Sequence, residues 1–141
     1  MTDMRERGKA ATSDAVRVLP LSREVAAGIC VLADSLGWCS VRIDLRGCHE
    51  KKCLLERTAS ALQFPDWFGQ NWDAWFDCLA DLAWLPATGY VVVLEHTDEL
   101  RESSPEVFDT AVSILEDAAQ VWAARDVPFF GFVGHAASRK Y

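Results

Sequence analysis

The chain has 141 residues and a formal net charge of −7, with half of its residues hydrophobic and a quarter charged. This length suits one domain with its own core, and the composition is that of a globular chain, which excludes disordered and fibrous classes. The negative charge argues against direct binding of nucleic acid, a polyanion that proteins hold with basic stripes. We therefore expect a basic protein as the partner.

The cysteines and the start of the chain indicate neither cross-links nor export. The five cysteines form no CxxC pair and no cluster with histidine: Cys30, Cys39, Cys48, Cys53 and Cys78. We therefore expect no disulfide framework, no metal site and no cofactor. The first residues lack the apolar core of a secretory signal, and no apolar run reaches membrane-spanning length. A cytoplasmic protein without membrane contact is expected.

The chain begins with a predicted tail and a predicted strand–helix pair. Residues 1–14 are small, polar and charged, which is typical of a flexible tail. A short strand ending at Pro20 follows, and Ser22 is a suitable N-cap for a helix that Gly37 ends. Apolar residues recur in this helix at three- and four-residue intervals, which predicts that they form its buried face: Val25, Ile29, Leu32 and Leu36.

Strands and helices alternate through the rest of the chain. "SVRIDL" alternates apolar and charged residues, which predicts a half-buried strand near residues 41–45. The β-branched run "YVVVL" predicts a fully buried strand near 90–95, and "VPFFGFVG" a last one near 128–133. Helices are predicted in "HEKKCLLERTASALQF" and from the N-cap Ser104 to about Arg125. This order predicts an α/β fold with a mostly parallel sheet, and leaves open whether the first strand joins it.

The segment "WFGQNWDAWFDCLADLAW", residues 67–84, holds four of the six tryptophans and no lysine or arginine. A helix that begins after the N-cap Asn71 advances about 100° per residue. One face then carries Trp72, Trp75 and Leu79, which we assign to the core. The opposite face carries Asp73, Asp77 and Asp81, spaced so that their like charges repel.

Aromatic residues border this acidic face. Phe76 lies on the acidic side, and Trp67 precedes the helix in a loop with Gly69. Exposed rings beside carboxylates are typical of an interface that attracts a cationic protein. Gly69 would allow the loop a positive φ or a close approach to that partner. An ordinary solvated face is the alternative interpretation, and the spacing leaves both open.

The run "FPDWFGQNWDAWFDCL", residues 64–79, resembles the signature loop and helix of the barstar family of bacterial ribonuclease inhibitors. The matching positions are Gly69, Asn71, Asp73, Ala74, Asp77 and Cys78. With the three strands, the resemblance covers about residues 40–134. It implies a barstar-like α/β fold, a three-stranded parallel sheet packed with helices, in a domain at 40–136. An N-terminal extension at 15–39, with a short strand and helix, would precede this domain, and a tail at 137–141 would follow it.

The resemblance also implies a function. It implies a stoichiometric inhibitor, an immunity protein or antitoxin and not an enzyme, whose acidic helix and aromatic loop block a nuclease active site. Asp77 would take the place of a substrate phosphate, with Asp73 supporting it. The implied partner-binding residues are Trp67, Phe68, Gly69, Asn71, Asp73, Phe76, Asp77, Asp81 and Glu116, with Asp117 as the alternative to Glu116. The partner would be a basic ribonuclease or toxin nuclease domain, and the free protein a monomer.

A second interpretation is an α/β enzyme or interaction module of unknown substrate. Glu95 and His96 end a predicted parallel strand, where α/β active sites commonly lie. His96 could then act with Asp73 or Asp77 as acid and base, or as metal ligands. No nucleophile and no ligand spacing supports this chemistry, so no catalytic residue and no metal ligand is assigned.

Overall fold

The computed structural model describes residues 15–66 and 68–136. Its elements in chain order are β1 (Val16–Pro20), α2 (Arg23–Ser35), β2 (Cys39–Asp44), α3 (Lys51–Leu62), α4 (Trp72–Asp81), β3 (Tyr90–Glu95), α5 (Asp98–Ser103), α6 (Pro105–Ala124) and β4 (Phe129–His135). The two predicted tails, residues 1–14 and 137–141, lie outside the described residues. Within the described ranges, no helix is long and apolar enough to cross a membrane.

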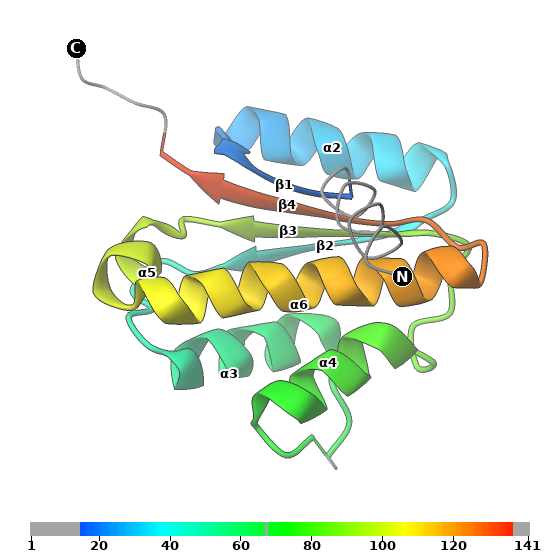
Figure 1. Ribbon diagram of the computed structural model, residues 1–141. Helices are drawn as coiled ribbons and strands as arrows, with labels where there is room; N and C mark the ends of the chain where they lie inside the picture. Colours follow the sequence, from blue (N-terminus) through cyan, green and yellow to red (C-terminus); the bar gives the residue numbers. More distant parts are fainter. Residues whose placement is uncertain (1–14, 67, 137–141) are drawn as a thin grey trace, which may run out of the picture.

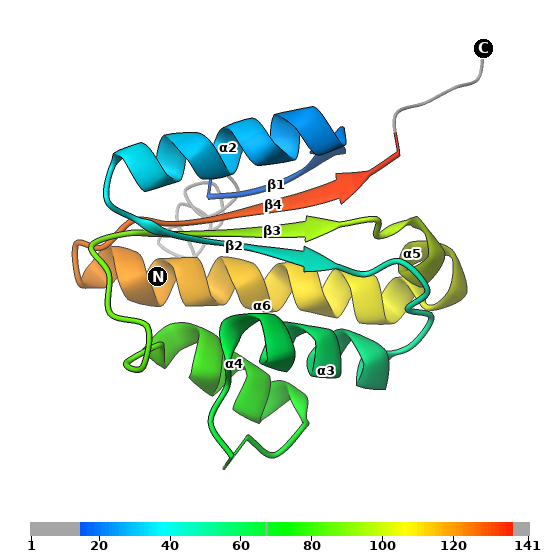
Figure 2. The ribbon, with the colours of Figure 1, turned by 180° about the vertical axis from the view of Figure 1, so that it is seen from behind.

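The four strands form one parallel sheet in the order β1-β4-β3-β2. α2 covers one face of the sheet, and α3, α4 and α6 lie on the other side (Figure 1; Figure 2). This is the predicted α/β fold, but the sheet has four strands and not three. The fourth is β1, which pairs with β4 from Val16 opposite Gly131 to Pro20 opposite His135. The division into an extension and a domain remains a prediction.

α2 begins and ends as the sequence predicts. The Ser22 hydroxyl accepts a hydrogen bond from the Val25 N–H at 3.1 Å, which caps the first turn. Gly37 ends the helix with a φ of +78°, and the Trp38 N–H donates to the Ala33 carbonyl at 3.0 Å. This is the pattern of a glycine-terminated helix.

The predicted buried face of α2 is wrong. The side chains of Val25, Leu32 and Leu36 are 51%, 63% and 54% exposed, whereas Ala26 and Ala33 are buried against the sheet. Alanines allow the helix backbone to lie close to the β-branched side chains of β3, which leaves no room for larger residues. The larger apolar side chains therefore lie to the side of the helix, where solvent reaches them, and do not pack on the sheet.

The main core lies between the other face of the sheet and α3, α4 and α6. α6 begins at Pro105 and ends one residue before Arg125, in agreement with the sequence prediction. The predicted side-chain cap is wrong, because the Ser104 hydroxyl donates instead to the His49 carbonyl at 2.8 Å. The short helix α5 between β3 and α6 was not predicted from the sequence.

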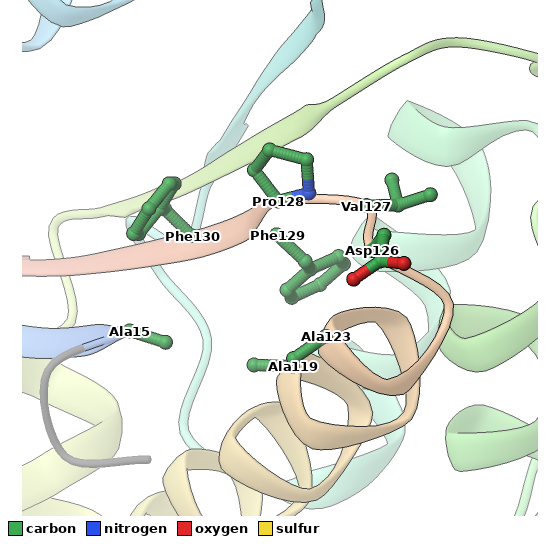
Figure 3. Close-up of a pocket in the computed structure, with 8 residues that line it drawn as sticks. All are labelled: Ala15, Ala119, Ala123, Asp126, Val127, Pro128, Phe129 and Phe130. Carbon is green, nitrogen blue, oxygen red and sulfur yellow. The ribbon is translucent and has the colours of Figure 1, made fainter. Parts of the chain in front are cut away.

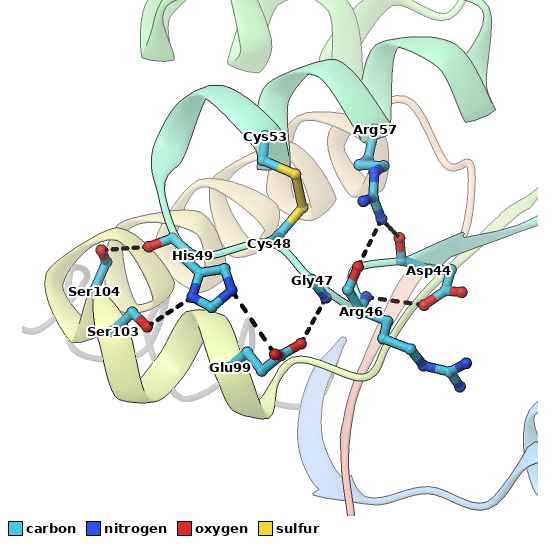
Figure 4. A network of polar contacts seen from close by, with 10 residues as sticks. All are labelled: Asp44, Arg46, Gly47, Cys48, His49, Cys53, Arg57, Glu99, Ser103 and Ser104. Carbon is cyan, nitrogen blue, oxygen red and sulfur yellow. Dashed lines mark hydrogen bonds and ion pairs between the residues drawn. A yellow bond between two sulfur atoms is a disulfide. The ribbon is translucent and has the colours of Figure 1, made fainter.

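Cys48 and Cys53 form a disulfide, so the expectation that the cysteines are not cross-linked is wrong. The bond closes the turn between β2 and α3, where the two Cα atoms lie 5.4 Å apart. Hydrogen bonds hold the same turn (Figure 4): Glu99 accepts from the Gly47 N–H at 2.6 Å, and Arg57 donates to two turn carbonyls. The sequence spacing alone does not show that this turn brings the two sulfurs together.

The two faces of β4 contribute to different clusters. Where α6 ends and β4 begins, a mostly apolar pocket of about 250 Å³ opens beside the strand (Figure 3). Phe129 points toward α6, and Phe130 lies on the other side of the strand, as the alternation of strand side chains requires. Phe129 therefore belongs to the main core, whereas Phe130 packs with the cluster beneath α2.

The disulfide gives a stability prediction. Addition of a reductant to the wild-type protein should lower the free energy of unfolding by about 2 kcal/mol, because a closed loop of about six residues restricts the unfolded chain. Urea unfolding with and without reductant measures this difference. The Cys48→Ser/Cys53→Ser double variant is the control and should not respond to the reductant. Equal wild-type midpoints under both conditions would contradict the prediction.

Candidate protein-binding site

The three aspartates of α4 lie on the solvent side of the helix. Asp73, Asp77 and Asp81 are all exposed, one turn apart. Among the residues that the structure describes, no lysine, arginine or histidine lies within 4 Å of their carboxylates. Their mutual repulsion is therefore not relieved by a close cation within the described chain, and the carboxylates remain open to a partner.

The opposite side of α4 points into the core. Trp75 and Leu79 have no exposed surface, which confirms their assignment. Trp72 is only partly buried, because it occupies the first position of the helix at the rim of the core. Its ring packs edge to face on Trp75 at 5.5 Å, and the Lys51 ammonium lies 5.5 Å from its centroid. α4 therefore has a buried face, an acidic face and an aromatic rim.

The first turn of α4 is fixed by its predicted N-cap. The Asn71 side-chain oxygen accepts a hydrogen bond from the Ala74 N–H at 2.8 Å, and its carbonyl accepts from the Trp75 N–H at 2.9 Å. Asp73 lies in the same turn, where the helix dipole favours an anion. Asn71 thus holds the start of the acidic helix with both its side-chain oxygen and its backbone carbonyl.

The last turn of α4 is held by two side chains at the end of α6, one from its last turn and one from its C-cap, that the sequence did not reveal. The Trp122 indole donates to the Leu79 carbonyl at 2.9 Å, and the Arg125 guanidinium donates to the Ala80 carbonyl at 2.8 Å. Arg125 also lies 4.8 Å from the centroid of a Trp122 ring. Its positive charge opposes the negative end of the helix dipole, where Asp81 is unfavourable. Both side chains lie more than 40 positions along the chain from the carbonyls they bind, so no local sequence pattern predicts these contacts.

The loop before α4 is held by an aromatic cluster. Phe64 packs edge to face on Phe68 at 5.0 Å and on Trp84 at 6.0 Å. The Trp84 indole donates to the Leu62 carbonyl at 2.9 Å, at the end of α3. Phe68 is consequently partly buried. Trp67, the aromatic residue on which the predicted interface depends most in this loop, lies outside the described residues.

Gly69 is exposed, but the positive φ suggested for it is wrong. The loop residue with a left-handed conformation is Gln70, with a φ of +56°. A Cβ atom on Gly69 would lie 3.2 Å from the side-chain nitrogen of Asn71. In the structure, the close neighbour of Gly69 is thus the cap residue of α4.

Phe76 and Glu116, two further predicted site residues, are less exposed than the aspartates. Phe76 is partly buried and packs against the main core. Glu116 is partly buried on α6 and has contacts within the chain, whereas Asp117 is exposed.

Cys78 of the signature is buried, and burial, with the carboxylates of Asp77 and Asp81, raises the pKa of its thiol to about 11. This thiol is therefore a core group.

The residues of the enzyme interpretation lie elsewhere. The Glu95 carboxylate accepts two hydrogen bonds from Arg42, at 2.9 and 2.7 Å, and His96 Nε2 lies 3.0 Å from an Arg46 guanidinium nitrogen. Glu95 is the last residue of β3 and His96 follows it, whereas α4 lies on the outer side of the helical layer in both views (Figure 1; Figure 2). The structure does not bring His96 together with Asp73 or Asp77. In the described ranges, no three metal-ligating side chains gather.

Comparison with known families matches the segment that contains this site. The family model described as Barstar (barnase inhibitor) matches residues 38–134, from just before β2 to the end of β4. The match includes α4 and its loop, and β1 and α2 precede it. A comparison with curated proteins finds no match.

The capping contact at α4 can be tested directly. Asn71→Ala removes the acceptor for the Ala74 N–H and should lower the free energy of unfolding by about 1 kcal/mol, as loss of an N-cap does. Denaturant unfolding measures this change. Asn71→Ser, which restores a capping oxygen, is the matched control and should recover most of the loss. If both variants are as stable as the wild type, the cap does not hold the helix.

Proposed function

The chain belongs to the barstar family, and we propose that it is a stoichiometric inhibitor of a barnase-type ribonuclease, an immunity protein or antitoxin that is not itself an enzyme. The observation that carries the proposal is the row of exposed carboxylates on α4, at the helix on which the family signature falls. Asp73, Asp77 and Asp81 project from one side of a helix whose other side is buried. A ribonuclease cleft holds an anionic backbone and offers cations to such a row.

Asp77 occupies the centre of the row, one turn from each of the other two carboxylates. A carboxylate in this position can accept paired, charge-assisted hydrogen bonds from arginine, which are among the strongest polar contacts between proteins. We assign Asp77 the place of an RNA phosphate in the nuclease and Asp73 a supporting role. Asp81 extends the negative field along the helix.

Aromatic side chains would supply the apolar part of the contact. Phe68 in the preceding loop and Phe76 on α4 are both only partly buried, so each ring keeps some surface for a partner. Rings of this kind bury a large area at a small entropic cost. Gly69 is exposed beside them. Trp67, which precedes Gly69 in the family signature, and Glu116, the position on α6 implied by the resemblance to the family, complete the proposed contact set.

The rigidity of α4 supports the same function. Asn71 fixes its first turn, and Trp122 and Arg125 hold its last carbonyls. A binding surface that is already ordered loses little conformational entropy on association. The carboxylates thus need no rearrangement of the helix to meet a nuclease.

The proposal predicts the effect of one carboxylate. Asp77→Ala should weaken binding to a barnase-type ribonuclease by at least about 100-fold, because removing one partner of a desolvated ion pair costs about 3 kcal/mol or more. Its free energy of unfolding should stay within about 1 kcal/mol of the wild type, as for other exposed positions. Titration calorimetry and urea unfolding measure the two quantities.

Asp109→Ala is the matched control for this experiment. Asp109 is an exposed aspartate on α6, so the variant has the same change of charge outside the proposed site. It should bind like the wild type. Unchanged ribonuclease binding by Asp77→Ala would remove Asp77 from its role.

The proposal also predicts a dependence on salt. The association rate with the ribonuclease should fall by about tenfold between low salt and about 0.5 M, because ions screen the attraction between the acidic face and a basic cleft. Stopped-flow mixing measures this rate. Asp81→Asn should reduce the salt dependence, since it removes one charge of the row. A rate that does not respond to salt would show that the acidic face does not steer association.

A further inference from the structure

α2 presents an apolar face to solvent. Among the described residues, five large hydrophobic side chains are exposed, and four of them lie on this helix or at its C-cap: Val25, Val31, Leu32 and Leu36. They are 51%, 67%, 63% and 54% exposed. Monomeric proteins seldom leave an apolar patch of this kind uncovered, and larger patches mark sites of association.

The spacing of the apolar residues on α2 is that of a helix–helix seam. Val25, Ile29, Leu32 and Leu36 follow one another at intervals of four, three and four residues, which is the repeat of a two-stranded coiled coil. This seam lies about 90° around the helix from Ala26 and Ala33, which face the sheet. The seam therefore points sideways, over the part of the sheet that α2 leaves open.

A groove lies beside the seam. α2 packs on β2 and β3, and it is the single described helix on this side of the sheet (Figure 1; Figure 2). Leu32 and Leu36 form one wall of the groove, and Phe130 and Phe132 of β4 line it from below. Its volume is about 280 Å³, and its lining surface is apolar throughout. The groove thus has room for apolar side chains from another helix and offers them no polar partner.

We propose that a second copy of the chain covers this face. The two α2 helices would pack side by side and parallel, seam against seam, about a two-fold axis that runs between them. Rotation about such an axis also turns the second sheet to the opposite side. Each α2 would then lie over β4 of the other copy, and the two sheets would enclose both helices.

The outer surface of α2 suits this arrangement. Gly28, Val31 and Ser35 lie on the side of the helix that faces away from its own sheet. A Cβ atom on Gly28 would have no neighbour within 4 Å, so this side is open. Pairing places these residues over Phe130 and Phe132 of the other copy, and the small ones allow a close approach. All four exposed apolar residues of α2 and its C-cap become buried.

The charges around the groove are complementary in the same arrangement. Arg17 of β1 is in register with Phe132, so its side chain projects on the α2 side of the sheet, where it is exposed. Glu24 lies in the first turn of α2 on the outward side. Within the described part of the chain, neither has an ion-pair partner within 4 Å. In the pair, Glu24 of each copy approaches Arg17 of the other.

Pairing through α2 leaves the proposed nuclease site open. α2 and α4 lie on opposite sides of the sheet (Figure 1), so both acidic faces of the pair remain accessible. The resemblance to the family implies a monomer, whereas the exposed apolar seam of α2 favours a pair. The test of the pair does not depend on the proposed function, because it measures mass and not inhibition.

Sedimentation velocity tests the pairing. The wild-type chain should sediment with twice the mass of one chain, and Leu32→Gln, at an exposed seam position, should weaken pairing by at least about tenfold. Val18→Gln, an exposed apolar position of β1 on the opposite face, is the matched control and should remain paired. A wild-type chain that stays monomeric up to about 100 µM, or a Leu32→Gln variant that pairs like the wild type, overturns the proposal.

A charge exchange tests the orientation of the two copies. Arg17→Glu and Glu24→Arg should each weaken pairing about fivefold, because each puts like charges together. The double variant restores opposite charges and should pair like the wild type. A double variant that pairs more weakly than either single variant overturns the parallel arrangement.

Discussion

The packing of α4 against α6 is the contact on which the orientation of the acidic face depends. Trp122 and Arg125 hold the last carbonyls of α4, and Trp75 anchors its middle with no exposed surface. These contacts fix the rotation of the helix about its axis. Because the rotation is fixed, the three aspartates have one direction left, which is outward. Burial of indole rings on one side thus produces a row of carboxylates on the other.

The same contacts offset the electrostatic cost of this row. Successive carboxylates repel one another, and Asp81 lies at the unfavourable end of the helix dipole. Arg125 places a positive charge on the last turn, and the Asn71 cap satisfies the first turn. The helix therefore keeps its charges exposed without unwinding. A row of exposed carboxylates on a rigid support suits an inhibitor that imitates RNA, which is the function we propose for this member of the barstar family.

The sheet divides the molecule into two sides with different surfaces. The side of α4 is acidic and aromatic, whereas the side of α2 is apolar around a groove over β4. The division follows from strand geometry, because Phe129 and Phe130 must point to opposite faces of β4 (Figure 3). Two surfaces on opposite sides of the sheet would permit the proposed contacts with a nuclease and with a second copy at the same time.

The sequence by itself determined every strand and helix except α5, and the direction of the acidic row. Apolar alternation located β2, and continuous apolar runs located β3 and β4. Cap residues located the starts of α2 and α4, and helical spacing separated Trp75 and Leu79 from the aspartates. These signals are local, since each depends on a few neighbouring residues. They also carry the likeness to the family, because the signature occupies one loop and one helix.

Only the tertiary structure decided which apolar face α2 buries, where β1 pairs, and what holds α4. Periodicity identifies a stripe of large apolar residues, but close packing on β3 selected Ala26 and Ala33 and left Leu32 in solvent. The hydrogen bond from Arg125 to the Ala80 carbonyl likewise forms only because folding places α6 beside α4. The Cys48–Cys53 disulfide forms because the turn before α3 brings the two sulfurs together. Such contacts are set by shape in three dimensions, and no local pattern of residues encodes them.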